Sequence, residues 1–410
     1  MISLNFEWPT FFLSALYKSI KMARPTKRAV HTRKISLEYR KANEPQRHFM
    51  LLNTLNFVFS IIALGLHYAK TSLCFLLNNV RPPKKSTFYK EQHKVVNCLC
   101  QMASNSMNKY AKKTHKNDVV SVDGAWDHRV NGGECQAVFI NQRIDKVIGV
   151  SLITKGSGKM VGNFDGCSQN MECEAIKRAL PKIKELNFSG YVHDQKKDVT
   201  NIFKNNWSAL EEHLDANHVK KSLERRIKKY NLLSDLKDKL IRWFYCIAKK
   251  NVKPERKQAL WLNSEQHYSG DHSKCGKHGQ VKNEWKLKNN KNAKEQLHKF
   301  LKETSETVMK VGHKYSTNTN ESFNSLHTQF ADKATSWKTS YRGRLAASIL
   351  QKNEPYVWIL DARKRLNLPE LDDEIKKDIN HLFHTQIQRR TTQKSPVYKM
   401  QRKENKSTKY

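Results

Sequence analysis

The chain has 410 residues, and its 75 Lys and Arg against 38 Asp and Glu give a formal net charge of +37 with His neutral. A hydrophobic fraction of 38% excludes a wholly disordered polybasic chain, and the low content of 15 Gly and 10 Pro excludes collagen-like and low-complexity classes. A charge of this size predicts a polyanionic partner, with nucleic acid first and an anionic membrane second.

The 8 Cys residues are scattered along the chain and include no Cys-x-x-Cys pair. A chain of this length and cysteine density does not depend on a disulfide scaffold, so we expect a reducing compartment.

Residues 1–47 are predicted to form a basic, disordered N-terminal arm. The segment 22–47, MARPTKRAVHTRKISLEYRKANEPQR, has little apolar content. Such a segment is typical of a nuclear-localisation or phosphate-contacting arm, and equally of a solvated tail.

The next region, 48–115, is predicted to be helical. Its stretch 49–66 carries no formal charge and just reaches the length of a membrane helix. Apolar positions continue past Lys70, which favours buried helices over a membrane span. A membrane-anchored basic protein therefore stays as the least favoured reading.

Within this region, the pattern from Ala63 to Phe75 predicts a helix, and the Pro82-Pro83 pair predicts a turn. Ser86 and Thr87 are expected to cap a following helix with a basic and aromatic start. This order fits a helix-turn-helix-like DNA-binding region, and also an ordinary helical hairpin. Candidate DNA contacts here are Lys84, Lys85 and Lys90.

Residues 116–218 change to an α/β pattern. Three short β-rich runs in 118–155 predict an antiparallel meander. A helix over 171–186, a strand over 187–194 and a short strand near Glu212 follow. The order of three strands, helix, strand, helix, strand predicts a mixed α/β fold and matches the first part of a ribonuclease-H-like core.

Three carboxylates lie at strand ends or a helix start, where their side chains could bind a metal ion. Asp123 and Asp194 come at the ends of predicted strands, and Glu321 lies at a helix start in STNTNESFNSLH. Hard oxygen ligands of this kind suit Mg²⁺ or Mn²⁺ in a two-metal site for phosphodiester chemistry. Each residue alone is more commonly a turn or cap residue. Because crowded anions repel one another, at least one is expected to have a raised pKa.

Five motifs in order carry a resemblance to a known family. They are DGAWDHR before the meander, NFDGCSQNMECEAI before a helix, YVHD at a strand end, LDANHVKKSL, and NTNESFNSLH. Over roughly 60–350, the chain resembles Mutator-like transposases of eukaryotic DNA transposons, in the branch that includes Kolobok-like elements. The resemblance implies a ribonuclease-H-like nuclease with an Asp-Asp-Glu triad, interrupted before its last helix by an all-helical insertion. It assigns the triad to Asp123, Asp194 and Glu321, and it matches His218 to a family histidine.

The chain departs from that family beside the second aspartate. Gln195 and Lys196 follow Asp194 where the family often has Gly-Asp. A lysine here would favour phosphate and oppose a cation, so the departure bears on activity more than on fold. Asp198 is a candidate substitute ligand.

The remaining regions are predicted as a helical insertion over 219–312, a last core helix with C-terminal helices over 313–388, and a basic, disordered tail over 389–410. Further candidate DNA contacts are Lys220, Lys221, Arg225 and Arg226.

The insertion also holds a compact group with Zn²⁺ ligand chemistry: His267, His272, Cys275 and His278. Related proteins commonly end such a cluster with a Trp-Cys pair, which is missing here. A full site would need His278 or a distant ligand such as His218, and chance clustering among 17 His is the alternative.

Together these features predict a nuclear, Mg²⁺- or Mn²⁺-dependent DNA transposase or domesticated derivative, working on transposon ends and target DNA as a homo-oligomer. No small-molecule substrate is expected. The first alternative is a catalytically inactive, transposase-derived DNA-binding protein.

Overall fold

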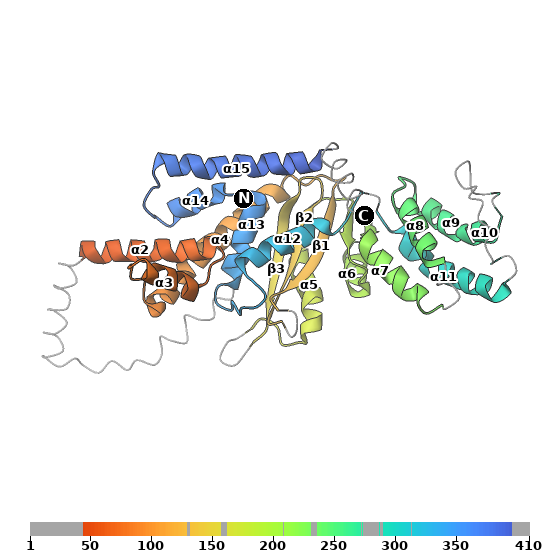
Figure 1. The fold of residues 1–410 in the computed structure, drawn as a ribbon, viewed down its shortest axis with the longest axis horizontal. Helices are drawn as coiled ribbons and strands as arrows, with labels where there is room; N and C mark the ends of the chain where they lie inside the picture. Colours follow the sequence, from red (N-terminus) through yellow and green to blue (C-terminus); the bar gives the residue numbers. More distant parts are fainter. Residues whose placement is uncertain are drawn as a thin grey trace. The chain divides into compact units, whose positions relative to one another are not determined.

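The computed structural model describes residues 44–395, except 129–131, 157–161, 208, 231–235, 272, 274–286, 288–289 and 313. The chain divides into two compact units. Unit 1 combines the chain up to Ser106 with the chain from Trp337 onward, and unit 2 runs from Met107 to Ser336. Figure 1 labels the helices and strands of both units.

Unit 2 is built on a five-stranded mixed sheet with the order β3-β2-β1-β4-β5. The strands are β1 (Val119–Trp126), β2 (Glu134–Asn141), β3 (Lys146–Thr154), β4 (Gly190–His193) and β5 (Glu211–Leu214). Strands β1, β2 and β3 pair antiparallel, which confirms the predicted meander. The mixed α/β class is likewise confirmed.

The pairing of β1 with β4 is parallel, and its register matters for the site. Val119 lies opposite Gly190 and Ser121 opposite Val192. Continuing this register by two residues places Asp123 level with Asp194 on neighbouring strands. Neighbouring strands lie about 4.8 Å apart, so the two carboxylates share one edge of the sheet.

Helices cover both faces of this sheet. On one face, α5 (Met171–Ile183) and α6 (Lys197–Asn206) bury an apolar cluster against Val120, Val122 and Tyr191. A short 3₁₀ turn, Ser168–Asn170, precedes α5. On the other face lies α12 (Asn318–Phe330), drawn across the strands in Figure 1. The alternation of β1 therefore sends Val120 and Val122 to the α5 face and Ser121 and Asp123 to the α12 face.

In the described residues between β5 and α12 the chain forms five helices and no strand, which fits the helical insertion expected there. They are α7 (Ala216–Ile227), α8 (Lys237–Ala248), α9 (Pro254–Leu262), α10 (Ser264–Tyr268) and α11 (Lys291–Met309). Their own apolar core is centred on Trp261, Phe244 and Phe300. The chain then returns beside β5, where Leu214 donates its N–H to the carbonyl of Lys310 at 2.9 Å.

Unit 1 is helical. Its elements are α2 (Glu44–Ala63), α3 (Tyr68–Leu77), α4 (Lys85–Ala111), which continues into unit 2, α13 (Tyr341–Asn353), α14 (Val357–Arg365) and α15 (Asp373–Lys394). The predicted region 48–115 is thus only part of a unit, because the C-terminal helices complete its core. Gln92 of α4 donates to Thr339 at 3.1 Å, and Arg344 of α13 donates to the carbonyl of Leu66 at 2.8 Å.

Three sequence predictions in unit 1 need correction. The helix expected from Ala63 to Phe75 is broken, because Gly65 adopts a φ of +68° and ends α2. Ser86 lies inside α4 and does not cap it, since the helix begins at Lys85. Helix α15 extends six residues into the tail that was expected to be disordered from Arg389.

The apolar stretch 49–66 falls on α2 and the turn after it. Among the helices in the described residues, none combines the length and the apolar content needed to cross a bilayer.

Candidate active site

The first two predicted carboxylates are held by hydrogen bonds from the segment that ends in α12. Asn324 donates its amide to Asp123 Oδ2 at 2.9 Å. The hydroxyl of Thr317 donates to Asp194 Oδ1 at 3.0 Å, and Thr317 is itself buried. The start of α12 is anchored to β1, since the hydroxyls of Ser121 and Thr319 lie 3.1 Å apart.

The third carboxylate joins the group through a histidine. His218 Nδ1 lies 3.2 Å from Asp194 Oδ2, and His218 Nε2 lies 3.5 Å from Glu321 Oε1. The imidazole therefore stands between the two carboxylates. Glu321 is more than half exposed, whereas Asp194 is half-buried. The structure thus brings Asp123, Asp194 and Glu321 close enough for their charges to act on one another, and their assignment as a catalytic triad stays a prediction.

The electrostatics of this site are unfavourable for three free anions. Burial, followed by the charges of Asp194 and Glu172, raises the pKa of Asp123 to about 8. Burial also raises the pKa of Asp194, although His218 and the Thr317 hydroxyl oppose that shift. The raised pKa was expected, but desolvation contributes more than repulsion between carboxylates.

A fourth carboxylate was missed by the sequence analysis. Glu172, in the first turn of α5, packs so closely on β1 that a Cβ added at Gly124 would lie 2.3 Å from its Cγ. Its Oε2 lies 2.8 Å from Lys196 Nζ. This changes the expected effect of Lys196, which neutralises Glu172. Only the sequence NMECEAI, in which acidic residues begin a helix, could have indicated this position.

Asp215 is a second missed residue. Its Oδ1 accepts the N–H groups of Asn217 and His218, which caps α7. Its Oδ2 accepts the N–H of Thr317 at 3.0 Å. One buried carboxylate therefore fixes both the start of the insertion and the residue that holds Asp194. The helix-start pattern LDANH predicts the cap, but the contact with Thr317 spans 102 residues and is not visible in sequence.

Behind Asp194, a buried ion-pair network joins the sheet to the insertion. Glu212 contacts His193 Nε2 at 3.0 Å and Lys310 Nζ at 2.9 Å, and it accepts the Thr200 hydroxyl. Burial opposes the charge on Glu212, but these hydrogen bonds outweigh it and lower its pKa to about 2. The residue adjacent to Asp194 is thus fixed by charge-assisted contacts.

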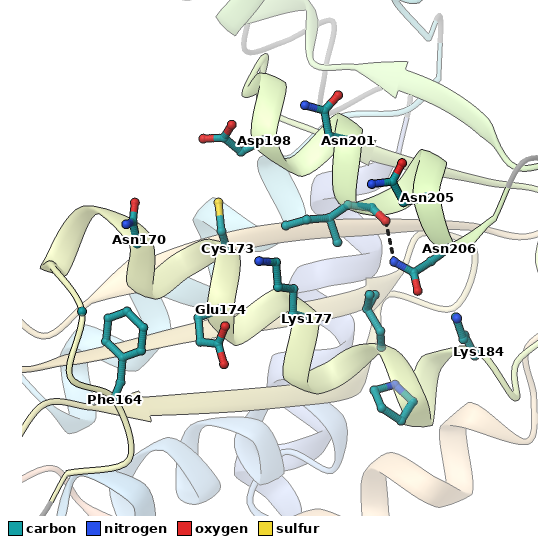
Figure 2. A pocket seen from close by; sticks show the side chains of 14 residues that line it. Phe164, Asn170, Cys173, Glu174, Lys177, Lys184, Asp198, Asn201, Asn205 and Asn206 are labelled. Carbon is teal, nitrogen blue, oxygen red and sulfur yellow. Dashed lines mark hydrogen bonds between the residues drawn. The ribbon is translucent and has the colours of Figure 1, made fainter.

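A groove of about 870 Å³ runs between α5 and α6 (Figure 2). Its polar lining groups include the amides of Asn170, Asn201, Asn205 and Asn206 and the ammonium groups of Lys177 and Lys184. Asp198, the candidate substitute for Asp194, also lines this groove in the first turn of α6. Within the described part of the chain, no hydrogen bond or ion pair joins Asp198 to Asp194.

The predicted zinc group falls mostly outside the described residues. His272, Cys275 and His278 are not described, and His267 lies in α10 with its ring 5.0 Å from the ring of Tyr268. The zinc prediction therefore stays a prediction.

The predicted DNA contacts are split between the units. Lys84, Lys85 and Lys90 are exposed around the start of α4. On α7, Lys221 and Arg225 are exposed one turn apart. Lys220 instead pairs with Glu224 at 3.0 Å, and Arg226 donates to the carbonyl of Glu303 at 3.4 Å.

In the described part of the chain, no group of three or more His, Cys, Asp and Glu side chains is placed to hold a metal ion as it stands. The donor chemistry nevertheless suits a hard divalent cation, because Asp123, Asp194, Glu321 and Glu172 offer only carboxylate oxygens. The raised pKa of Asp123 points the same way, since a nearby cation would stabilise its ionised form. His218 occupies the space between two of these carboxylates, so a cation placed there requires the imidazole to move.

Comparison with known proteins adds no family to these observations. No protein-family model matches the chain, and no curated protein matches it.

Proposed function

We propose that the protein is a DNA transposase of the Asp-Asp-Glu type, or a domesticated derivative, that cuts transposon ends and joins the freed 3′-hydroxyl to target DNA. Two observations carry this proposal. Asp123 on β1 lies level with Asp194, which directly follows the parallel strand β4, and His218 contacts both Asp194 and Glu321. Carboxylates at one sheet edge are the arrangement that divalent-cation phosphodiester chemistry needs.

The sheet supports a ribonuclease-H-like core under this proposal. Its meander is antiparallel, and its two further strands are added parallel through helical crossovers. The net charge of +37 supports a nucleic-acid substrate and a nuclear location. A homo-oligomer is part of the same proposal, as the family resemblance implies.

In this site, the residues divide into ligands and positioning groups. Asp123, Asp194 and Glu321 would hold Mg²⁺ or Mn²⁺, which when bound supplies the positive charge that activates the attacking oxygen and stabilises the leaving oxygen. Asp123 would give up its proton on binding. Thr317 and Asn324 orient the two aspartates, and Lys196 keeps the charge of Glu172 from adding to theirs.

A second candidate is a catalytically inactive DNA-binding derivative. The observation that favours it is His218, which bridges Asp194 and Glu321 where a cation would bind. Gln195 and Lys196 in place of Gly-Asp point the same way. The least favoured reading, a membrane-anchored basic protein, is supported only by the apolar stretch 49–66.

The test is nicking of a supercoiled plasmid that carries the DNA flanking the coding sequence, with Mg²⁺ or Mn²⁺. The variants Asp123→Asn, Asp194→Asn and Glu321→Gln should each lower nicking by at least about 100-fold while leaving salt-sensitive DNA binding intact. The matched control is Glu174→Gln, since Glu174 pairs with Arg178 on α5, outside the carboxylate group. It should cut normally.

Folding is the second readout. Asp123→Asn keeps an acceptor for Asn324 and removes a carboxyl whose charge is disfavoured, so its stability should equal or exceed that of the parent chain. Nicking that survives in Glu321→Gln would remove the triad assignment. If the parent chain binds DNA but never nicks it, the protein is the catalytically inactive derivative instead.

A further inference from the structure

Helix α3 presents an apolar stripe to solvent. Leu73, Leu76 and Leu77 are 57%, 57% and 78% exposed, and with Ala69 they fall on one face of the helix. The buried residue of α3 is Ser72. An amphipathic helix normally turns such a stripe inward. Helix α3 instead packs inward through the rings of Tyr68 and Phe75, which lie 6.5 and 5.0 Å from the ring of Phe57, and leaves its leucines exposed. Exposed apolar patches of this kind mark protein interfaces.

The surroundings of this stripe are basic. Between Leu64 and Lys90 the sequence has no Asp or Glu, whereas it carries five cations: Lys70, Arg81, Lys84, Lys85 and Lys90. Further exposed apolar residues, Leu64, Leu66 and Val80, lie in the same stretch. A partner for this surface should therefore combine an apolar stripe with acidic residues.

Helix α15 has those properties. It spans 22 residues, yet none of its described residues is buried. Ile375, Ile379 and Leu382 recur at helical spacing, with Ile375 44% and Leu382 51% exposed. A helix this exposed lacks the tertiary packing that normally stabilises helices in proteins.

The N-terminal half of α15 is also acidic in a strongly basic chain. The acidic residues are Asp373, Glu374 and Asp378 in the helix, together with Glu370 and Asp372 just before it. Lys376 pairs with Glu370 and Asp373, and Lys377 is the other cation in this stretch. The net charge of 370–378 is therefore negative, opposite in sign to the region around α3.

Within unit 1, these two helices do not meet. Figure 1 draws α3 below α2 and α15 above α14, so other helices of the unit separate them. The apolar stripe of α3 is thus not covered by α15 of its own chain.

We propose that α3 of one copy docks on the N-terminal half of α15 of a second copy, and that the contact is reciprocal. A twofold axis then gives two identical α3–α15 contacts and closes the assembly as a dimer. Doubling the contact also brings the buried area toward the roughly 1,200–2,000 Å² of stable interfaces. The inference does not depend on the catalytic proposal, because no residue of the carboxylate site takes part.

The test is the mass of the full-length chain in solution, freed of nucleic acid, as a function of concentration. The parent chain should form dimers. Leu73→Glu and Leu76→Glu should each raise the dimer dissociation constant by about 10-fold to 100-fold, because each places a charge in an apolar contact. The matched control is Val252→Glu, another exposed apolar position at 40%, which should leave the constant unchanged.

Reversing the charges on both helices tests whether α15 is the element that binds α3. Asp373→Lys with Glu374→Lys should weaken the dimer, and adding Lys84→Glu with Lys85→Glu in the same chain should restore it. A chain that stays monomeric at every concentration overturns the proposal. A dimer whose dissociation constant is unchanged in the α3 variants also overturns it. If Phe11→Glu with Phe12→Glu is needed before dimers appear, the apolar segment 1–20 covers α3 and the proposal is wrong.

Discussion

Two buried carboxylates of unit 2, Asp123 and Glu212, have opposite electrostatic surroundings. Asp123 is desolvated among other carboxylates, so its pKa rises to about 8, while Glu212 receives three hydrogen bonds and its pKa falls to about 2. The first arrangement is the one proposed to take up a cation, and the second holds the end of β4 in place. Both depend on contacts that lie far apart in sequence.

Glu212 predicts a pH dependence of stability. Its pKa in the folded protein lies below the ordinary 4.5, so its ionised form stabilises the fold above that pH, and this contribution is lost as the pH falls from 4.5 toward 2. Glu212→Gln should therefore lower the free energy of unfolding by about 2–3 kcal/mol near pH 7. Urea unfolding at a series of pH values should show the gap between variant and parent narrowing below 4.5. A gap that stays constant with pH would contradict the assignment.

Gly124 predicts a steric effect on the same site. A methyl group there would lie 2.3 Å from Glu172 Cγ, so Gly124→Ala should push Glu172 away and break its pair with Lys196. We expect a loss of about 1–3 kcal/mol in unfolding free energy and a lower rate of nicking. The control is Gly133→Ala, where the nearest atom would be 3.8 Å away. Equal stability of the two variants would show that Glu172 moves freely.

At the scale of elements, the sequence predicted those strands and turns that contacts between nearby residues determine. The alternation of Val120, Ser121 and Val122 predicted a strand, and the meander followed because each turn connects neighbouring strands. The break at Gly65 was missed because one glycine within an apolar run is a weak indication of a boundary. The pairing of α4 with α13 was missed because it joins residues about 250 positions apart, beyond any local pattern.

Asp215 gives an element-scale prediction, since it fixes both ends of the insertion. Asp215→Ala leaves the N–H groups of Asn217, His218 and Thr317 without their acceptor. We expect a loss of about 2–4 kcal/mol in unfolding free energy. Asp215→Asn keeps one acceptor oxygen and should lose about half as much. Hydrogen exchange should increase both at the start of α7 and near Thr317, and an increase at only one of them would contradict the shared anchor.

At the scale of the whole molecule, the sequence predicted the three carboxylates of the site but not the residues that surround them. Asp123, Asp194 and Glu321 were named from motif order, and the register of β1 with β4 explains why the two aspartates meet. Glu172, Asp215 and Thr317 were not named, because their roles arise only when α5, α7 and α12 are packed on the sheet. The charge of +37 was visible at once, but which cations are available to bind a phosphate was not.

The structure separates the predicted DNA contacts of α7 into exposed cations and a cation paired with an acidic side chain, and this gives a prediction for binding. Lys221 and Arg225 are exposed, whereas Lys220 is paired with Glu224. Each Lys or Arg that neutralises a phosphate contributes about 0.9 to the slope of log affinity against log salt for duplex DNA. Lys221→Ala with Arg225→Ala should therefore lower the magnitude of that slope by about 1–2 and weaken binding most at low salt.

The matched control for these two variants is Lys220→Ala, which removes a cation already neutralised by Glu224 and should leave the slope nearly unchanged. Lys84→Ala with Lys85→Ala makes the same measurement for unit 1, where the two side chains are exposed at the start of α4. Fluorescence anisotropy with one duplex over a series of salt concentrations separates these outcomes. If the α7 double variant keeps the parent slope while the unit 1 variant loses it, DNA contacts unit 1 and not this face of α7.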